Sequence, residues 1–388
     1  IMPSIPRQGM ERANLQIMRM MRQRGAEVLF VVEANYGEVI QREVARIGCR
    51  SASASILRSF EERLHIGKSP QEMFGVVRAW ARAARQIDAI YRHYRPTHIY
   101  VTSLAFFLYA LPTLWRSRQP VIFRLPNPPA SGLTKSKQRI SDWLWRHAVL
   151  PACDVAICNS QYTLTKLRQI CRDIGSAQVI HNCLAQRPAV SSDAPRLDLR
   201  RFNIAYLGRI RAEKGVKQLF DAALRLVREQ ETIDFYFAGE YHWKNPFAEA
   251  LIAEAHAQHL GHRIHFTGEI EDVFGLLKQC DLHVCPSTSP GESFPNVLLE
   301  AKSLGLPSVV FPTAGIPECV SHKLDGYVCA EPSADALYTG IRYFFDSPQR
   351  LEIAGKVAAA SLARFAQERI GDQWAALFKS TDRPAHVA

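Results

Sequence analysis

Short runs of β-branched and aromatic residues alternate with longer segments in which apolar residues recur at helical spacing. Segments 11–24 and 71–92 show this spacing, which predicts helices with one apolar face. The short runs predict strands at 28–32, 98–102, 121–125, 154–158 and 178–181, and again at 203–207, 234–238, 263–267, 281–285, 308–311 and 326–329. Strands that alternate with helices in this way are typical of parallel sheets covered by helices.

The predicted strands fall into two sets, with segment 186–201 between them. That segment is rich in Pro, Ser, Arg and Asp, a composition typical of a linker. We therefore expect an α/β fold with two parallel-sheet domains, the first over 1–185 and the second over 202–361. A length of 388 residues suits two domains of ordinary size. Because the chain begins with Ile1 rather than Met, we also expect the native start, with part of a first strand, to be missing.

Composition excludes several classes of protein. An apolar fraction of 47% and a charged fraction of 22% are typical of a folded globular chain and not of a disordered one. The most apolar stretch, 100–115, contains Pro112 and is shorter than the roughly 20 residues of a membrane-spanning helix, so we expect a buried helix there. The nine cysteines form no C-x-x-C pair, which predicts free thiols in a reducing, cytoplasmic compartment.

The charge of the chain is uneven. Lys and Arg exceed Asp and Glu by 48 to 37, a net charge of +11, which indicates an anionic partner. Residues 1–190 carry 27 basic and 12 acidic side chains, and the rest of the chain has a net charge of −4. The basic helices of the first half are either solvated surface or a face that binds an anionic membrane. No platform of aromatic and basic residues stands out, so we do not expect a nucleic acid as the partner.

The segment 286–300 follows a predicted strand and opens a helix, with Pro295 suited to the first turn. The free amides of such a helix start favour an anion. Two carboxylates, Glu292 and Glu300, flank this point, and carboxylates accept hydrogen bonds from hydroxyl groups. A sugar nucleotide supplies both chemistries, because its diphosphate lies between a ribose and a hexose. The alternative interpretation is an acidic residue that stabilises a helix dipole.

The segment 206–215 also follows a predicted strand. Gly208 lets the backbone turn at the carboxyl end of that strand, where open α/β sheets bind ligands. Arg209 and Lys214 lie in the short loop before a helix predicted at 216–228, and phosphate oxygens are the natural partners of such cations. The alternative interpretation is a pair of solvated loop cations.

The glycine, arginine and lysine of 208–215, followed by Glu292 and Glu300, resemble the retaining glycosyltransferases of family 4 (group 1). Further matches are Asn159 with Ser160, 179–182, 266–268, 315–318, 325–326, and 9–11 with 22–25. The resemblance covers nearly the whole chain. It implies the GT-B fold, in which two Rossmann-like domains face a cleft, and it implies that a last helix at 362–380 packs back onto the first domain.

The resemblance also implies roles for individual residues. Arg209 and Lys214 would hold the diphosphate, and Glu292 would contact hydroxyls of the transferred sugar, so these three form the expected catalytic group. Glu300 would bind the ribose hydroxyls. The other expected donor-binding positions are Gly208, the backbone at Phe294, Pro295, Asn296 and Val297, the base-binding Gly268, Glu269 and Ile270, and Gly9 of the first domain.

Two positions depart from the family pattern. Many members carry a histidine after the strand that lies here at 121–125, and Arg124 or Asn127 would have to take that place on the acceptor side. The loop after Ala238 begins with Gly239 but has no second glycine nearby, so its approach to the nucleotide is expected to differ.

The chain contains no D-x-D motif, so we expect the two cations to replace a metal ion and no cofactor to be needed. Four histidines recur every three residues from His256 to His265, but Gly261 interrupts them, so we expect no metal site there. The expected activity is hexosyl transfer, with retention, from a nucleotide sugar to a lipid-linked or cell-surface glycan precursor at the inner face of the plasma membrane. The alternatives are a sugar-nucleotide epimerase or hydrolase, or a non-catalytic nucleotide-sugar-binding partner of a glycan-assembly complex.

Overall fold

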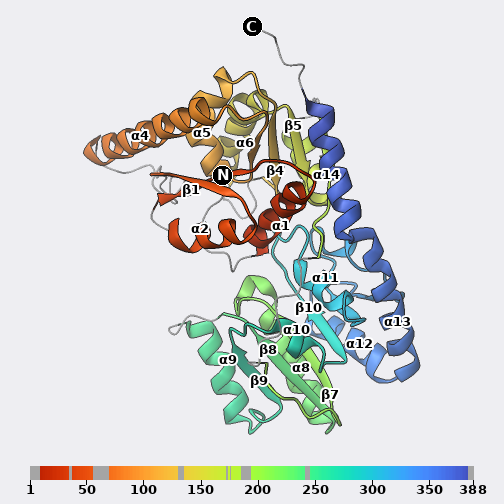
Figure 1. Ribbon diagram of the computed structural model, residues 1–388. Coiled ribbons are helices and arrows are strands. Elements are labelled where there is room, and N and C mark those ends of the chain that lie inside the picture. The colour runs from red at the N-terminus through yellow and green to blue at the C-terminus, as the bar shows by residue number, and fades with distance from the viewer. Residues whose placement is uncertain are drawn as a thin grey trace. The chain divides into compact units, whose positions relative to one another are not determined.

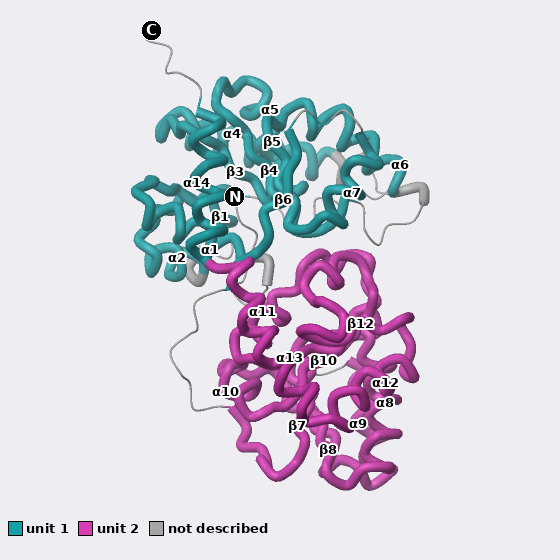
Figure 2. The backbone as a smooth tube through the Cα atoms, turned by 90° about the vertical axis from the view of Figure 1, so that its right-hand side faces the viewer, with its two compact units in different colours: residues 1–185, 367–388 teal, residues 186–366 magenta. Residues whose placement is uncertain are grey.

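The computed structural model describes residues 9–34, 37–55, 70–129, 135–171, 174, 176–184, 194–240 and 245–382. The chain forms two compact units, which Figure 2 colours separately. Unit 1 comprises Ile1–Ala185 and Gln367–Ala388, and unit 2 comprises Gln186–Ala366. All strand pairs among these described residues are parallel.

Unit 2 is built on one six-stranded sheet. Its strands are β7 (Phe202–Leu207), β8 (Ile233–Ala238), β9 (Ile264–Gly268), β10 (Leu282–Cys285), β11 (Ser308–Val310) and β12 (Gly326–Val328). Its helices are α8 (Val216–Glu229), α9 (Pro246–Ala257), α10 (Val273–Leu277), α11 (Asn296–Lys302), α12 (Ala334–Phe345) and α13 (Pro348–Ser361), with short turns η4 (Ala212–Lys214), η5 (Ile316–Glu318) and η6 (Leu362–Phe365). The strands lie in the order β12-β11-β10-β7-β8-β9, which is the order of a dinucleotide-binding sheet.

Apolar residues of unit 2 cover both faces of this sheet. Ile204 and Tyr206 of β7 pack in one core with α8, α9 and α12, while Ala205 and Leu207 pack in a second core with α10 and α11. Successive side chains of a strand point to opposite faces, so β7 is buried on both sides. This explains why the central strands of unit 2 read as continuous apolar runs and could be predicted from sequence.

Unit 1 has two separate parallel sheets, β1-β2 and β3-β4-β5-β6. Its strands are β1 (Leu29–Glu33), β2 (Arg50–Ala54), β3 (Ile99–Val101), β4 (Val121–Leu125), β5 (Val155–Cys158) and β6 (Ala177–Val179). Its helices are α1 (Gly9–Gln23), α2 (Gly37–Arg46), α4 (Pro70–Tyr94), α5 (Leu104–Arg116), α6 (Lys135–Leu144), α7 (Gln161–Ile170) and α14 (Gln367–Thr381), with turns η2 (Trp145–Val149) and η3 (Leu150–Ala152). One helical layer contains α4 and α5, and the other contains α1, α2 and α14 (Figure 1). Helix α7 packs in the same core as α4 and α5.

Two expectations from sequence differ from the structure, and one strand was not expected. Strand β2 was not predicted, because Arg50–Ala54 contains only Arg, Ser and Ala and none of the residues that favour strands. The apolar stretch 100–115 is not one helix, since its first residues belong to β3 and α5 begins at Leu104. The segment 362–380 is not one helix either: Ala366 has an extended backbone after η6, and α14 begins at Gln367 and packs against α1 within unit 1.

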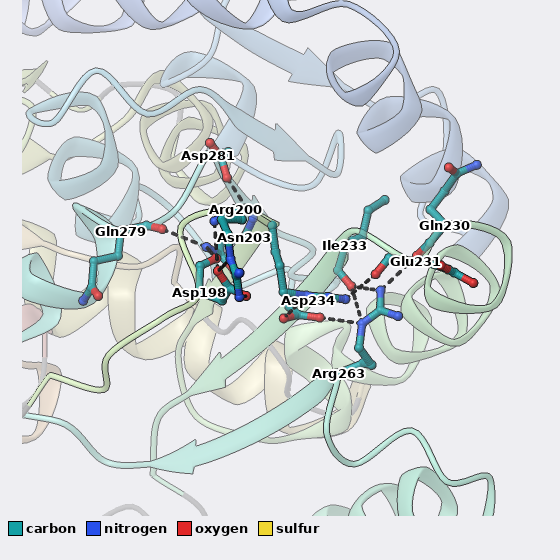
Figure 3. A network of polar contacts seen from close by, with 11 residues as sticks. Asp198, Arg200, Asn203, Gln230, Glu231, Ile233, Asp234, Arg263, Gln279 and Asp281 are labelled. Carbon is teal, nitrogen blue, oxygen red and sulfur yellow. Dashed lines mark hydrogen bonds and ion pairs between the residues drawn. The ribbon is translucent and has the colours of Figure 1, made fainter.

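A buried ionic network fastens the amino-terminal ends of β8 and β9 (Figure 3). The carboxylate of Asp234 lies 2.6 Å from the guanidinium of Arg263 and 2.6 Å from that of Arg201. The Nε of Arg263 also donates to the carbonyl of Ile233 at 3.0 Å. The side chain of Asp234 is only 5% exposed, so its charge depends on these two arginines for compensation.

We predict that Asp234→Ala lowers the free energy of unfolding by about 3–5 kcal/mol, because the change leaves Arg263 buried without its carboxylate. The matched control is Asp346→Ala, which removes the exposed partner of Arg342 and is expected to cost about 1 kcal/mol or less. Urea unfolding followed by circular dichroism measures both values. Equal losses in the two variants would contradict a structural role for the buried network.

Candidate functional site

The strand order of unit 2 indicates which edge of the sheet is the candidate binding site. The chain adds β8 and β9 on one side of β7, and β10, β11 and β12 on the other. In open α/β sheets, ligands bind beyond the carboxyl ends of the strands, at the point where successive strands begin to be added on the opposite side of the sheet. That point lies between β7 and β10, so the loops 208–215 and 286–295 flank it. These are the two loops that carry the charged residues expected from sequence.

The two loops are joined through their backbones. The carbonyl of Glu213 accepts hydrogen bonds from the amide of Thr288 at 3.1 Å and from its hydroxyl at 3.2 Å. Gly215 has φ +68°, and a Cβ atom there would lie 1.7 Å from the carbonyl oxygen of Pro286. Only glycine fits this backbone conformation and this approach. The positions of Thr288 and Gly215 therefore keep the two loops side by side.

Lys214 and Glu292, which sequence places in different loops, form an ion pair. The same carboxylate accepts a hydrogen bond from the hydroxyl of Ser287 at 3.1 Å, and the carbonyl of Glu292 accepts one from the amide of Gly315 at 3.1 Å. The side chains of Lys214 and Glu292 are 22% and 17% exposed. The pair is thus held in place and still open to solvent, so that an anion could contact the ammonium group. The sequence did not predict that Ser287 and Gly315 hydrogen-bond to Glu292, since neither residue type indicates a contact between loops.

Arg209 is exposed, and its backbone is fixed by the hydroxyl of Tyr206, which donates to the Arg209 carbonyl at 2.8 Å. Burial raises the pKa of Tyr206 well above its ordinary value, so the hydroxyl keeps the proton that it donates. The amide of Gly208 donates to the carbonyl of Ala238 at 3.0 Å. Among the described residues no carboxylate forms an ion pair with Arg209, so its charge is available to a ligand.

The loops after β8 and β9 meet the loop after β7 at the same edge. A Cβ atom on Gly239 would lie 1.9 Å from the carbonyl oxygen of Gly208, so this glycine permits close packing of the two loops. The amide of Gly239 donates to the carbonyl of Gly268 at 2.8 Å. Glu269 is exposed and Ile270 is half-buried against the core that contains α10 and α11. Gly268, Glu269 and Ile270 therefore lie beside the expected donor site, with Gly239 between them and Gly208.

Helix α11 begins at Asn296, with Pro295 just before it as the N-cap residue. The ring of Phe294 is buried and packs edge-on against Phe365, with 5.3 Å between centroids. Val297 packs against the core. The ring of Phe294 and the side chain of Val297 thus pack within unit 2, and the expected contact of their backbone groups with the donor stays a prediction.

Glu300 is half-buried on α11. An ion pair between the buried side chains of Lys302 and Asp325 holds the carboxyl end of this helix. The ammonium group of Lys302 lies 2.6 Å from the carboxylate of Asp325, and each side chain is 2% exposed. Lys302 also donates to the hydroxyl of Ser361 at 3.0 Å, and Asp325 accepts from the amide of Ser321 at 2.7 Å. The pair was missed from sequence, because a lysine in a helix is ordinarily exposed.

The candidate residues of the first half belong to unit 1. Arg124 is 1% exposed, and its guanidinium donates to Asn14 and to Asn182, both at 2.6 Å. Arg124 therefore fastens α1 to the segment after β6, and its contact with an acceptor stays a prediction. Asn127 is exposed and stays a prediction. Gly9 is the first residue of α1.

Cysteines and histidines are the other side chains that could carry chemistry. All nine cysteines are free, as predicted, and burial raises the pKa of Cys285 to about 12, so this thiol stays protonated beside the candidate site. Within the described ranges, no cluster of three or more His, Cys, Asp or Glu side chains could hold a metal ion. His256 lies in α9 and His265 in β9, so they do not share a helical face. Among the described helices none is long and apolar enough to span a bilayer.

Two family models match the chain in succession. The model of Glycosyltransferase Family 4 matches residues 7–184, and the model of Glycosyl transferases group 1 matches residues 191–360. Together they cover most of both units, including the two loops described above, and they leave out residues 361–388.

Individual proteins show the same likeness. An alpha-D-kanosaminyltransferase of Streptomyces kanamyceticus is 26% identical over 66% of this chain and 67% of its own length. An N,N'-diacetylbacillosaminyl-diphospho-undecaprenol alpha-1,3-N-acetylgalactosaminyltransferase of Campylobacter jejuni is 29% identical over 42% of this chain, and the match spans only 41% of that enzyme. The structure of Anabaena HepE in complex with UDP and glucose is 18% identical, with a TM-score of 0.75 over 97% of each chain. This likeness confirms the expected fold class, an α/β fold with two Rossmann-like parallel-sheet domains.

We predict that Gly215→Ala separates the two loops, because the new methyl group would occupy the position of the Pro286 carbonyl. The amide of Thr288, which donates to Glu213, should then exchange with solvent at least tenfold faster. Gly25→Ala is the matched control: Gly25 also has positive φ, +88°, but nothing lies within 4 Å of its added Cβ, so the cost is the backbone strain alone, about 1–2 kcal/mol. Hydrogen exchange read by mass spectrometry compares the two. Unchanged exchange at Thr288 in Gly215→Ala would show that the loops do not depend on this contact.

Proposed function

Because the chain belongs to glycosyltransferase family 4 (group 1), and is thus an enzyme that uses a nucleotide sugar, we propose that it transfers a hexosyl group with retention and without a metal ion. The proposed acceptor is a lipid-linked or cell-surface glycan precursor. The observation that carries this proposal is the arrangement of Arg209, Lys214 and Glu292 at the reversal point of the unit 2 sheet. Two cations beside a carboxylate match a ligand that carries both phosphate and hydroxyl groups.

Arg209 and Lys214 are proposed to bind the diphosphate of the donor. Arg209 presents an exposed guanidinium on a fixed backbone, and Lys214 presents an ammonium group already held at the mouth of the site. When a phosphate oxygen approaches Lys214, Glu292 can keep its hydrogen bond from Ser287 and accept further bonds from sugar hydroxyls. Glu300 on the anchored helix α11 is proposed to accept the ribose hydroxyls.

In the proposed reaction the bond between the anomeric carbon and the diphosphate oxygen breaks, and its electron pair stays on the diphosphate. The acceptor hydroxyl oxygen bonds to the anomeric carbon from the same face, and its proton passes to the departing phosphate oxygen. Negative charge therefore grows on the diphosphate in the transition state. Arg209 and Lys214 stabilise that charge where it develops, which is a role that a metal ion would otherwise fill.

The proposed acceptor side is unit 1, whose helices carry the basic surplus of the chain. Trp143 of α6 and Trp115 of α5 are 59% and 60% exposed. Arg139 and Arg146 flank Trp143 in sequence, and an aromatic ring among basic residues suits the surface of an anionic membrane. The name of the Campylobacter relative includes a diphospho-undecaprenol-linked sugar, which supports a lipid-linked acceptor here.

We predict that Lys214→Ala lowers kcat/KM for the nucleotide sugar about 100-fold, the cost of removing one group that stabilises transition-state charge. The matched control is Lys217→Ala, which removes the exposed lysine that pairs with Asp221 on α8 and should leave the rate within about twofold. A donor screen by thermal shift with uridine, guanosine and adenosine diphosphate sugars selects the substrate for the rate assay. Near-normal turnover by Lys214→Ala would show that the phosphate is bound elsewhere, and donor consumption without any acceptor would favour an epimerase or hydrolase.

We predict that the protein floats with liposomes of acidic phospholipids, and that salt releases it, because the charges of unit 1 are screened. Trp143→Ser should weaken this binding several-fold. Leu324→Ser is the control, since Leu324 is equally exposed at 61% but lies in unit 2. Equal recovery with neutral and acidic liposomes would exclude the membrane proposal and leave the transferase proposal standing.

A further inference from the structure

A pocket of 480 Å³ lies at one side of the unit 2 sheet, and we call it the Tyr343 pocket. Its lining residues come from the turn before β12, from β12 and from α12, and they include Lys323, Tyr327, Tyr338, Arg342, Tyr343 and Asp346. β12 is the outermost strand of the sheet and runs parallel to its neighbours. Because Lys323 precedes β12, the pocket reaches the amino-terminal end of this strand. The candidate donor site lies beyond the carboxyl ends of β7 and β10, so the two sites are separate.

The walls of the Tyr343 pocket are held by close packing. A Cβ atom on Gly340 of α12 would lie 2.8 Å from the ring of Tyr327, so this helix packs directly on β12. The amide of Lys323 donates to the carbonyl of Gly326 at 2.7 Å, which closes the turn before β12. The same turn contains Asp325, whose buried ion pair with α11 is described above. The side chains that line the pocket therefore extend from a fixed backbone.

Two cations beside the Tyr343 ring lack a counter-charge. The ammonium group of Lys323 lies 5.7 Å from the centroid of this ring, and the guanidinium of Arg350 lies 4.7 Å from it. A cation within about 6 Å of an aromatic centroid is attracted to the ring. Among the described residues, no carboxylate forms an ion pair with Lys323 or Arg350, and Asp346 in the pocket is paired with Arg342 at 2.9 Å. The charges of Lys323 and Arg350 are therefore available to an anion.

Two tyrosine hydroxyls are also available to a ligand. The rings of Tyr327 and Tyr343 are half-buried, with 5.4 Å between their centroids. In the part of the chain that the structure describes, neither hydroxyl has a hydrogen-bond partner, whereas the hydroxyl of Tyr338 donates to Glu229 at 2.6 Å. A phenol hydroxyl can both donate and accept a hydrogen bond. The pocket thus combines positive charge for an anionic group with hydroxyls that match those of a sugar.

We propose that the Tyr343 pocket binds an acidic saccharide, a sugar chain that bears carboxylate or phosphate groups. Lys323 donates a charge-assisted hydrogen bond to the anionic group, and Arg350 adds positive charge from α13. Tyr327 and Tyr343 bind hydroxyls of the sugar ring. The volume of 480 Å³ is within the roughly 300–1,000 Å³ of ligand pockets. This binding goes beyond the proposed transfer reaction and uses none of its residues.

The cations on the tyrosine rings favour a saccharide over a nucleic acid. Proteins that bind single-stranded nucleic acid stack its bases on open aromatic faces. Here the guanidinium of Arg225 lies only 3.7 Å from the centroid of Tyr338, and Lys323 and Arg350 lie beside Tyr343. These cations leave little ring face for a base. The anionic and hydroxyl groups of a ligand are what the pocket can recognise.

Fluorescence anisotropy with labelled tetragalacturonate, an acidic tetrasaccharide, tests the proposal on the full chain. We expect saturable binding that salt weakens, because the charges are screened, and that neutral maltotetraose does not compete for. Competition by galacturonate or by mannose 6-phosphate shows whether the pocket prefers a carboxylate or a phosphate. Lys214→Ala, altered at the proposed donor site, should bind the tetrasaccharide as tightly as the unchanged chain.

Single variants locate the binding. Lys323→Gln should weaken it about tenfold, the loss of one charge-assisted hydrogen bond. The matched control is Lys356→Gln, which removes an exposed lysine that pairs with Glu352 on α13 and should change the affinity less than about twofold. Tyr343→Phe keeps the ring and removes only its hydroxyl, so the affinity for tetragalacturonate should fall about threefold. Competition by inorganic phosphate should not change in Tyr343→Phe.

Several outcomes would overturn the proposal. Absence of saturable binding, or equal affinity in Lys323→Gln and Lys356→Gln, would show that the pocket does not bind an acidic saccharide. Unchanged affinity in Tyr343→Phe would show that the pocket holds an anion without contacting sugar hydroxyls. Binding of a labelled single-stranded oligonucleotide that Lys323→Gln abolishes, without binding of the saccharide, would assign the pocket to a nucleic acid. Each readout is independent of sugar transfer, so the proposed function could fail while this inference holds, or the reverse.

Discussion

The close approach of two backbones, Gly215 against Pro286, is the constraint on which the candidate site depends. It brings the loop after β7 to the loop after β10 at the one edge of the sheet where the strand order reverses. Lys214 and Glu292 can form their ion pair only because these loops touch, although many residues separate them in sequence. Backbone geometry therefore positions Lys214 and Glu292, and a side chain at position 215 would separate the two loops that carry them.

Helix α11 is held at both ends by one short segment. Phe294, just before the helix, packs on Phe365, and Lys302, the last residue of the helix, donates to Ser361. This segment, 361–365, lies next to the end of unit 2 at Ala366, and the chain enters unit 1 at Gln367. A shift of α11 when a donor binds would thus act directly on the stretch of chain that leads from one unit to the other. The buried charge of Asp325 opposes such a shift, since breaking its pair with Lys302 leaves two uncompensated ions.

The strands of unit 2 could be predicted from sequence, because β7, β8 and β10 are buried on both faces and read as unbroken apolar runs. The loops with Lys214 and Glu292 could be predicted from glycine and charge placed directly after strands. Strand β2 could not, since its Ser and Ala residues have no strand preference. Nor could the Lys302–Asp325 pair or the engagement of Arg124 by Asn14 and Asn182, because these contacts are made by tertiary packing and leave no local pattern.

The pairing of Lys214 with Glu292 bears on which anions the proposed enzyme would accept. An inorganic phosphate that bound Lys214 would weaken the pair and bring its own negative charge near the carboxylate of Glu292, so binding would be opposed by repulsion. A sugar diphosphate offers phosphate oxygens to Lys214 and hydroxyl donors to Glu292 at the same time. Ser287 already shows that this carboxylate accepts a hydroxyl while it faces the ammonium group. The ion pair thus favours a ligand that offers phosphate oxygens to Lys214 and hydroxyl groups to Glu292 at the same time. This preference does not depend on contacts to the base or to the acceptor.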